Sequence, residues 1–229
     1  MNVIFVKSES TAKSIRTFWF KPPSPVHYTA GQFIELRLPH PKPDNRGEKR
    51  WFTLSSSPTE PLLSITTKLS EPGSTFKKTL FGLKPGKQVH MSDPMGDFVL
   101  PKDTSIPLLF VAGGIGITPV HSMIKWLSDS NEKRQVSIIY VAASKEEFAF
   151  TELFRAYGAK VTMFSSDQDD TKAHLSAQSI VDLAQPTTQT QIYLSGPEPM
   201  IENIVAQFEE LGYDQHRLIT DYFPGYTPI

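Results

Sequence analysis

The chain has 229 residues, 39% hydrophobic and 21% charged, which is typical of a globular protein with one large or two small domains. Its formal net charge of −1 at pH 7 gives no sign of a nucleic-acid partner, and no apolar run is long enough to cross a bilayer. The absence of cysteine excludes disulfides, thiolate catalysis and a cysteine-ligated cluster, and the scattered histidines show no metal-site spacing. Because no leader segment is recognisable, we expect a cytoplasmic protein without a metal.

The first hundred residues alternate between short strand-like runs and turn-forming residues, a pattern typical of a β-barrel or β-sandwich. The predicted strands are residues 3–7, 14–20, 32–38, 50–55, 62–68 and 88–92. Prolines lie between these runs, where they interrupt no strand pairing. One short helix is expected at residues 74–82.

Two stretches of this half carry groups suited to a ligand. On a strand, Thr53 and Ser55 would share one face, Arg50 could pair with a phosphate and Thr53 could hydrogen-bond a ligand ring. The alternative is an amphipathic strand with a solvated arginine, which the pattern alone favours. The segment 73–75, Gly-Ser-Thr, opens the short helix and could bind an anion, or it could simply cap that helix.

A strand, a glycine turn and a helix follow one another at residues 106–127. The run 106–112 is apolar throughout, which predicts a strand buried on both faces. The turn contains Gly113, Gly114 and Gly116, and then come Thr118, expected as the helix N-cap, and Pro119, expected at the first helical position. Backbone N–H groups and the helix N-terminus would suit a phosphate, although a purely structural turn is the alternative.

The remaining residues alternate between strands and helices, which predicts a parallel sheet covered on both faces. The expected strands are 135–142, 161–164, 191–194 and 218–220, and the expected helices are 146–157, 176–184 and 199–211. Ligands of such sheets bind beyond the carboxyl ends of the strands, where the loops at 113–118, 143–145, 195–197 and 221–226 would meet. A second glycine junction in residues 195–197 favours a dinucleotide, and the aromatic tail could be core or could cover a ring.

Several of these stretches are similar to motifs of one family. Residues 50–53, Arg-Trp-Phe-Thr, resemble an Arg-x-Tyr-Ser/Thr flavin motif with Phe52 in place of tyrosine, and residues 28–33 resemble the segment before it. The similar motifs that follow are residues 73–77 for flavin phosphates, 113–119 for the nicotinamide nucleotide, Ser-Gly-Pro-x-x-Met at 195–200, and the tail with Phe223 and Tyr226. Over nearly its whole length the chain resembles the ferredoxin–NADP reductase family of flavin oxidoreductases.

The resemblance implies a fold and a set of residue roles. Residues 1–102 would form a six-stranded antiparallel β-barrel that binds FAD, and residues 103–229 a doubly wound, five-stranded parallel sheet that binds NAD(P). The implied catalytic residues are Thr53, Ser195 and Phe223. The implied cofactor-binding residues are Arg50, Phe52, Thr53, Ser55, Thr66, Lys68, Gly73, Ser74, Thr75, Gly114, Gly116, Thr118, Gly196, Pro197, Phe223 and Tyr226.

The resemblance also implies an activity, hydride transfer from NAD(P)H to the flavin and then electron transfer to a separate acceptor. FAD is favoured over FMN. Ser195 departs from the family's cysteine, which leaves the activity in place but leaves its rate open. Residues 142–147, Ala-Ala-Ser-Lys-Glu-Glu, carry two glutamates and slightly favour NADH, although Lys145 or Lys172 could bind the extra phosphate of NADPH.

Two other functions stay open from the sequence. A flavin-free NAD(P) dehydrogenase would need an acid or base in the cleft, and no residue is a convincing candidate. A regulatory or sensor module would bind flavin or nucleotide without turnover, and Ser195 is the feature that favours it.

Overall fold

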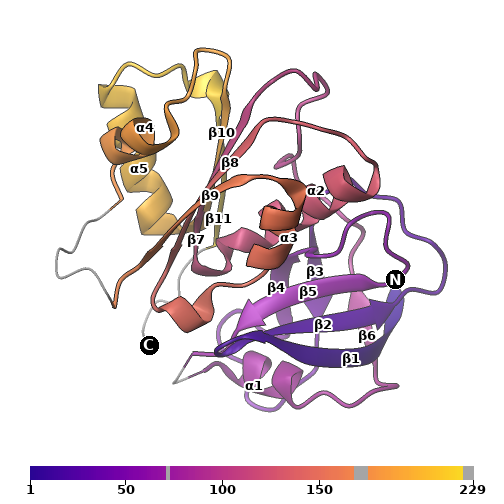
Figure 1. The fold of residues 1–229 in the computed structure, drawn as a ribbon. Helices are drawn as coiled ribbons and strands as arrows, with labels where there is room; N and C mark the ends of the chain where they lie inside the picture. The colour runs from indigo at the N-terminus through magenta and orange to yellow at the C-terminus, as the bar shows by residue number, and fades with distance from the viewer. Residues whose placement is uncertain (71–72, 168–174, 224–229) are drawn as a thin grey trace.

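The computed structural model describes residues 1–70, 73–167 and 175–223 (Figure 1). A β-barrel forms the first part of the chain, and a β-sheet with helices on both faces forms the second. Two residues named above, Lys172 and Tyr226, lie outside the described residues. No helix of the described residues is both long and apolar enough to span a membrane.

The barrel is built from antiparallel strands in the order β4-β3-β6-β1-β2-β5. These are β1 (Asn2–Ala12), β2 (Ile15–Lys21), β3 (Phe33–Arg37), β4 (Lys49–Thr53), β5 (Leu63–Lys68) and β6 (Gln88–Met91). A bridge between Leu54 and Ile65 joins the two edges, so the sheet closes. The prediction of a six-stranded antiparallel barrel is therefore confirmed.

Alternating apolar side chains fill the barrel, as the period of two in a strand requires. Phe18 and Phe20 of β2 and Ile34 and Leu36 of β3 are completely buried. The helix α1 (Thr75–Phe81) lies at the foot of the barrel in Figure 1 and packs Phe76 and Leu80 into the same core. The barrel thus holds α1 at a fixed place beside strand β4.

The second part is a parallel sheet in the order β11-β10-β7-β8-β9, which confirms the predicted five-stranded doubly wound sheet. Its strands are β7 (Leu108–Gly113), β8 (Val136–Ala142), β9 (Lys160–Ser165), β10 (Gln191–Pro197) and β11 (Leu218–Phe223). The strand order changes direction between β7 and β10. The loops that follow these two strands therefore meet at the carboxyl edge, where sheets of this type bind ligands.

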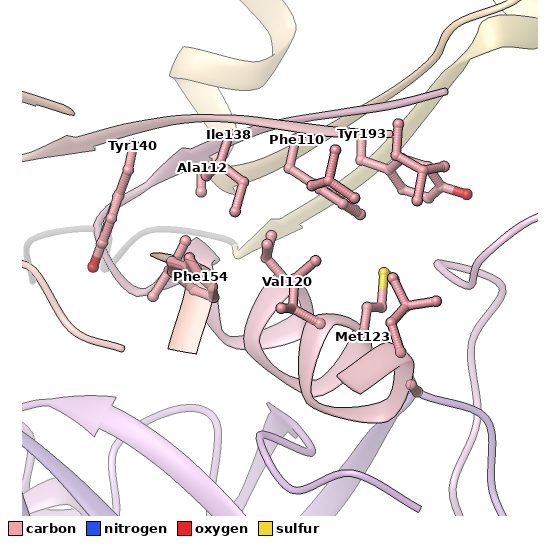
Figure 2. Close-up of a cluster of buried hydrophobic side chains, with 14 of the residues drawn as sticks. Phe110, Ala112, Val120, Met123, Ile138, Tyr140, Phe154 and Tyr193 are labelled. Carbon is pink, nitrogen blue, oxygen red and sulfur yellow. The ribbon is translucent and has the colours of Figure 1, made fainter. Parts of the chain in front are cut away.

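Helices cover both faces of the sheet. They are η1 (Gly114–Gly116), α2 (Ile117–Asp129), η2 (Lys145–Glu147), α3 (Thr151–Tyr157), α4 (Ala177–Ala184), α5 (Glu198–Glu210) and η3 (Gln215–Arg217). In Figure 2, Val120 and Met123 of α2 point toward Phe110 and Ile138 of the sheet. The helices α4 and α5 pack on the opposite face.

Two expectations about helix starts are wrong. Thr118 is not an N-cap, because Gly114–Gly116 already form a helical turn and α2 begins at Ile117. The helix expected at 146–157 is divided into η2 and α3, with Phe150 between them in a left-handed conformation (φ 65°). The buried hydroxyl of Tyr140 explains the break, since it bonds the backbone of Glu147 and Ala149 and so replaces helical partners.

Candidate cofactor and nucleotide site

The turn after β7 exposes one glycine to a potential ligand. Gly114 has a positive φ of 54°, and a β-carbon built there would meet no atom of the described residues within 4 Å. A residue with this backbone conformation and open surroundings lets N–H groups approach an anion closely. Among the described glycines of the two junctions, Gly114 best matches the predicted role in nucleotide binding.

The other junction glycines have a packing role. A β-carbon on Gly116 would lie 2.2 Å from the carbonyl oxygen of Ser195, and one on Gly196 would lie 3.2 Å from three backbone atoms of Gly113. The two loops therefore touch backbone to backbone, and side chains at these positions would separate them. This contact accounts for Gly116 and Gly196 without a ligand, and any role in binding is additional.

Thr118 is almost fully buried, and its hydroxyl donates to the carbonyl oxygen of Ile115 at 3.0 Å. It stabilises the turn between η1 and α2. Its oxygen can still accept a hydrogen bond, so the predicted contact with a nucleotide stays a prediction.

Ser195 ends the buried part of β10, in register with Ala112 of β7 on one side and Asp221 of β11 on the other. Its Oγ is buried and has no hydrogen-bond partner among the described residues. Burial raises the pKa of Asp221 to about 6. The hydroxyl of Ser195 and the desolvated carboxyl of Asp221 thus lie on neighbouring strands. Two residues further along β10, the backbone of Pro197 is in register with that of Phe223. The Phe223 side chain lies outside the described part of the structure.

The strand β4 presents a second unpaired hydroxyl. Thr53 is 3% exposed, and its Oγ1 also has no hydrogen-bond partner in the described part of the chain. Nearby hydroxyls are paired: Ser55 Oγ lies 2.8 Å from Thr66 Oγ1, which lies 2.8 Å from Thr17 Oγ1. Buried polar atoms are rarely left without a partner. Among the described residues, Thr53, Ser144 and Ser195 have buried hydroxyls of this kind, and Thr53 and Ser195 lie in the two predicted ligand motifs, whereas Ser55 and Thr66 bond one another.

Arg50 lies where the flavin motif predicts it, but it already has an anionic partner. Its Nη2 donates to both carboxylate oxygens of Asp44 at 2.7 Å, and its guanidinium lies 4.9 Å from the centre of the Phe76 ring. Phe52 stacks on that same ring at 6.0 Å and is 9% exposed. Arg50 and Phe52 therefore face α1 together, and Phe76 is the aromatic ring that Phe52 contacts.

The start of α1 is capped in the ordinary way. The Ser74 hydroxyl accepts from the Lys77 backbone N–H, and the Thr75 hydroxyl donates to the carbonyl oxygen of Lys42 at 3.0 Å. A β-carbon on Gly73 would lie 2.6 Å from Leu69 Cδ1. The capping alternative is thus realised at Ser74, and the predicted phosphate contacts of residues 73–75 stay untested.

Lys68, expected to bind the cofactor, joins the two parts of the chain. Its Nζ lies 2.5 Å from Glu147 Oε1 on the loop after β8. The sheet and barrel are also connected by His121 of α2, whose Nδ1–H donates to the Ser55 carbonyl oxygen at 2.7 Å. Because a carbonyl only accepts, the proton of His121 must be on Nδ1.

Three residues around this site were not singled out in the sequence. Asp44 sits in a proline-rich loop that reads as plain surface, and its partner Arg50 is six residues away. His121 occurs alone on a helix, which gives no ligand spacing. Asp221 was part of the aromatic tail but had no role of its own. Asp221 becomes a candidate site residue only because it is buried beside β10, and no pattern in the sequence indicates that burial.

Comparison with known proteins adds to this geometry. Residues 110–206 match the family described as the oxidoreductase NAD-binding domain. This segment of the chain is therefore similar to an oxidoreductase NAD-binding domain. The matched segment contains both glycine junctions described above.

Solved structures show that the fold is that of the ferredoxin–NADP reductase family. Ferredoxin–NADP+ reductase from Plasmodium falciparum has a TM-score of 0.79 at 15% identity, covering 97% of this chain and 95% of that chain. The FAD/NAD-binding domain of nitric oxide dioxygenase from Vibrio cholerae has a TM-score of 0.78 at 20% identity, covering 98% of both chains. The predicted family resemblance is therefore confirmed at the level of fold.

Curated relatives are similar over most of this chain. Flavohemoprotein A from Dictyostelium discoideum is 27% identical over 95% of this chain and 59% of its own length. The glycine betaine monooxygenase reductase subunit from Pseudomonas aeruginosa is 27% identical over 93% of this chain and 61% of its own length. This chain thus spans about three fifths of the length of these relatives.

Proposed function

We propose that this chain is a FAD-dependent reductase that accepts hydride from NADH and passes electrons to a separate acceptor. The observation that carries the proposal is that the buried hydroxyls of Thr53 and Ser195 have no partner among the described residues. One belongs to the barrel motif that resembles a flavin site, and the other to the carboxyl edge of the nucleotide-binding sheet. Both are polar atoms that a bound cofactor or nucleotide would satisfy.

The proposed cofactor supplies hydride acceptance and one-electron release, which amino-acid side chains do not provide. Residues 1–102 would bind it, with Arg50 on its phosphate and the Thr53 hydroxyl as a hydrogen-bond partner of its ring. Residues 103–229 would bind the nucleotide, with the amides around Gly114 on its phosphates and Ser195 beside its nicotinamide. The protein's contribution is to hold the two rings in contact and exclude water.

NADH is favoured over NADPH by the loop after β8. Glu146 is an exposed carboxylate there, and Glu147 is already paired with Lys68. An acidic residue after the second strand of such a sheet suits the ribose hydroxyls of NADH and repels the 2′-phosphate of NADPH. Lys145 is the exposed cation of this loop that would work in the opposite direction.

The acceptor is proposed to be a separate protein. Relatives are named as reductase subunits of stachydrine N-demethylase and of glycine betaine monooxygenase, which favours an oxygenase component as the class of partner. FAD is favoured over FMN because structures with this fold are described as binding FAD.

The test is an anaerobic absorbance titration of the FAD-reconstituted protein with NADH and then with NADPH. The proposal expects NADH to bleach the flavin band and NADPH to do so more weakly. A band that neither nucleotide bleaches would favour the sensor alternative, and failure to bind FAD or FMN would favour the flavin-free dehydrogenase.

Variants assign the site. Arg50→Ala should lose flavin, whereas Arg37→Ala, an exposed arginine of the same barrel, should keep it. Glu146→Gln should improve use of NADPH, and Glu152→Gln, an exposed glutamate of α3, should not. Full flavin occupancy in Arg50→Ala would refute the flavin-site assignment.

A further inference from the structure

Asp44 engages the guanidinium of Arg50 on the same N–H groups that an anionic ligand would use. Both of its carboxylate oxygens lie 2.7 Å from Arg50 Nη2, with the two side chains 17% and 10% exposed. Arg50 Nη1 donates to the carbonyl oxygens of Gly47 and Lys49 at 2.9 and 2.6 Å. Among the described residues, the one buried nitrogen of this guanidinium without a partner is Nε.

The loop that carries Asp44 also reaches the start of α1. Its Lys42 carbonyl oxygen accepts a hydrogen bond from Thr75 Oγ1. Asp44 is fixed within the loop by the backbone N–H of Arg46, which donates to its Oδ1 at 3.0 Å, and the Arg46 guanidinium also contacts it. One loop, residues 39–48, therefore occupies two groups, Arg50 and Thr75, that the flavin motifs assign to phosphate.

We propose that Asp44 sets the affinity of this chain for phosphate-bearing flavins by competing with the flavin phosphate for Arg50. The inference rests on the proposed flavin site. A phosphate that binds the Arg50 fork must displace the carboxylate, and the Lys42 carbonyl must release Thr75. Breaking the Asp44–Arg50 and Lys42–Thr75 contacts costs free energy, and this cost weakens the observed binding of the cofactor.

The competition has a specific chemical signature. Carboxylate and phosphate both form charge-assisted, paired hydrogen bonds with arginine. FAD and FMN carry phosphate, and riboflavin does not. The carboxylate of Asp44 therefore opposes the binding of FAD and FMN but leaves riboflavin affinity unaffected.

Asp44→Asn is the discriminating variant, because asparagine preserves the local turn and removes the charge. Dissociation constants for FAD, FMN and riboflavin would be measured by flavin fluorescence in the wild-type chain, in Asp44→Asn and in Glu48→Gln. Glu48 is the matched control, since it lies at the end of the same loop and pairs with Arg37 instead of Arg50. The side-chain amide of Asp44→Asn could itself accept a hydrogen bond from Arg50, so Asp44→Ser, with a shorter side chain, repeats the test.

The expected result is an approximately tenfold tighter binding of FAD and FMN by both Asp44 variants, with riboflavin and Glu48→Gln unchanged. Unchanged or weaker FAD binding by the Asp44 variants would overturn the proposal, since Asp44 would then position Arg50 for the phosphate. Equal tightening by Glu48→Gln, or equal tightening of riboflavin, would overturn it too. If Arg50→Ala binds FAD as the wild type does, the proposed flavin site fails, and this inference fails with it.

Discussion

Gly116 lies directly against the backbone of Ser195. A β-carbon built on Gly116 would stand 2.2 Å from the Ser195 carbonyl oxygen and 2.7 Å from the Gly196 nitrogen. The φ of Gly116 is −59°, which any residue adopts, so the constraint is steric and not conformational. The two glycine junctions of the nucleotide-binding domain are thereby fixed relative to each other.

This contact predicts that Gly116→Ala is destabilising. The added methyl group meets rigid backbone, so the β7 and β10 loops must separate, and we expect a loss of about 3 kcal/mol in unfolding free energy. Gly114→Ala is the matched variant, because its surroundings are open and only its positive φ opposes a side chain, at a cost of about 1 kcal/mol. Urea unfolding measures both. Equal losses of unfolding free energy in the two variants would contradict a steric role for the contact between Gly116 and Ser195.

Acid should destabilise the chain through His121. Burial is the largest cause that lowers the pKa of His121 to about 4 from 6.5. Between these values the unfolded chain binds more protons than the folded one, so stability falls as the pH decreases from 6.5 to 4, by at most ~3 kcal/mol. Thermal unfolding between pH 4 and pH 7 measures the effect.

His121→Asn is the informative variant for this acid effect, because its amide nitrogen can still donate to the Ser55 carbonyl but does not titrate. The slope of stability against pH should be smaller in this variant over the same window. Asp221 titrates in the opposite direction within this range, so only the difference between wild type and variant isolates His121. An identical slope in both proteins would argue against a neutral buried His121.

Asp221→Asn should stabilise the chain at alkaline pH. Burial raises the pKa of Asp221 to about 6 from 3.8, so the folded chain holds the proton more tightly and stability declines as the pH rises through this window. Removal of the charge should add about 1–2 kcal/mol at pH 8 and nearly nothing at pH 4. Urea unfolding at both values tests it, with exposed Asp182→Asn as the control. A gain that is independent of pH would show that the carboxylate charge is not the cause.

Lys68 and Glu147 should couple the barrel to the sheet. Their side chains are 29% and 13% exposed, and their atoms lie 2.5 Å apart. A double-mutant cycle with Lys68→Met and Glu147→Gln should give a coupling energy of about 1 kcal/mol, above that of an exposed pair. The exposed pair Lys7–Glu9, at 2.7 Å within the barrel, serves as the comparison and should give a value near zero. Equal coupling in both pairs would refute a specific role at the interface.

Local patterns in the sequence determine most of the elements. The apolar run before Gly113 becomes a strand buried throughout, and the helix expected after the glycine turn becomes α2, which buries Val120, Met123, Ile124 and Leu127. These predictions succeed because the period of side chains along a strand or helix is a local property. The helix at 146–157 fails because the Tyr140 hydroxyl, from another strand, takes over backbone groups of that segment.

The candidate site divides in the same way. The sequence by itself identified both glycine junctions and the strand with Arg50 and Thr53, since each is a short run of residues with a defined chemistry. Tertiary structure alone decided that Asp44 pairs with Arg50, that Lys68 pairs with Glu147, and that Thr53 and Ser195 find no partner in the described part of the chain. A side chain's partner depends on which distant backbone the fold brings beside it, and single-sequence patterns carry no information about those long-range distances.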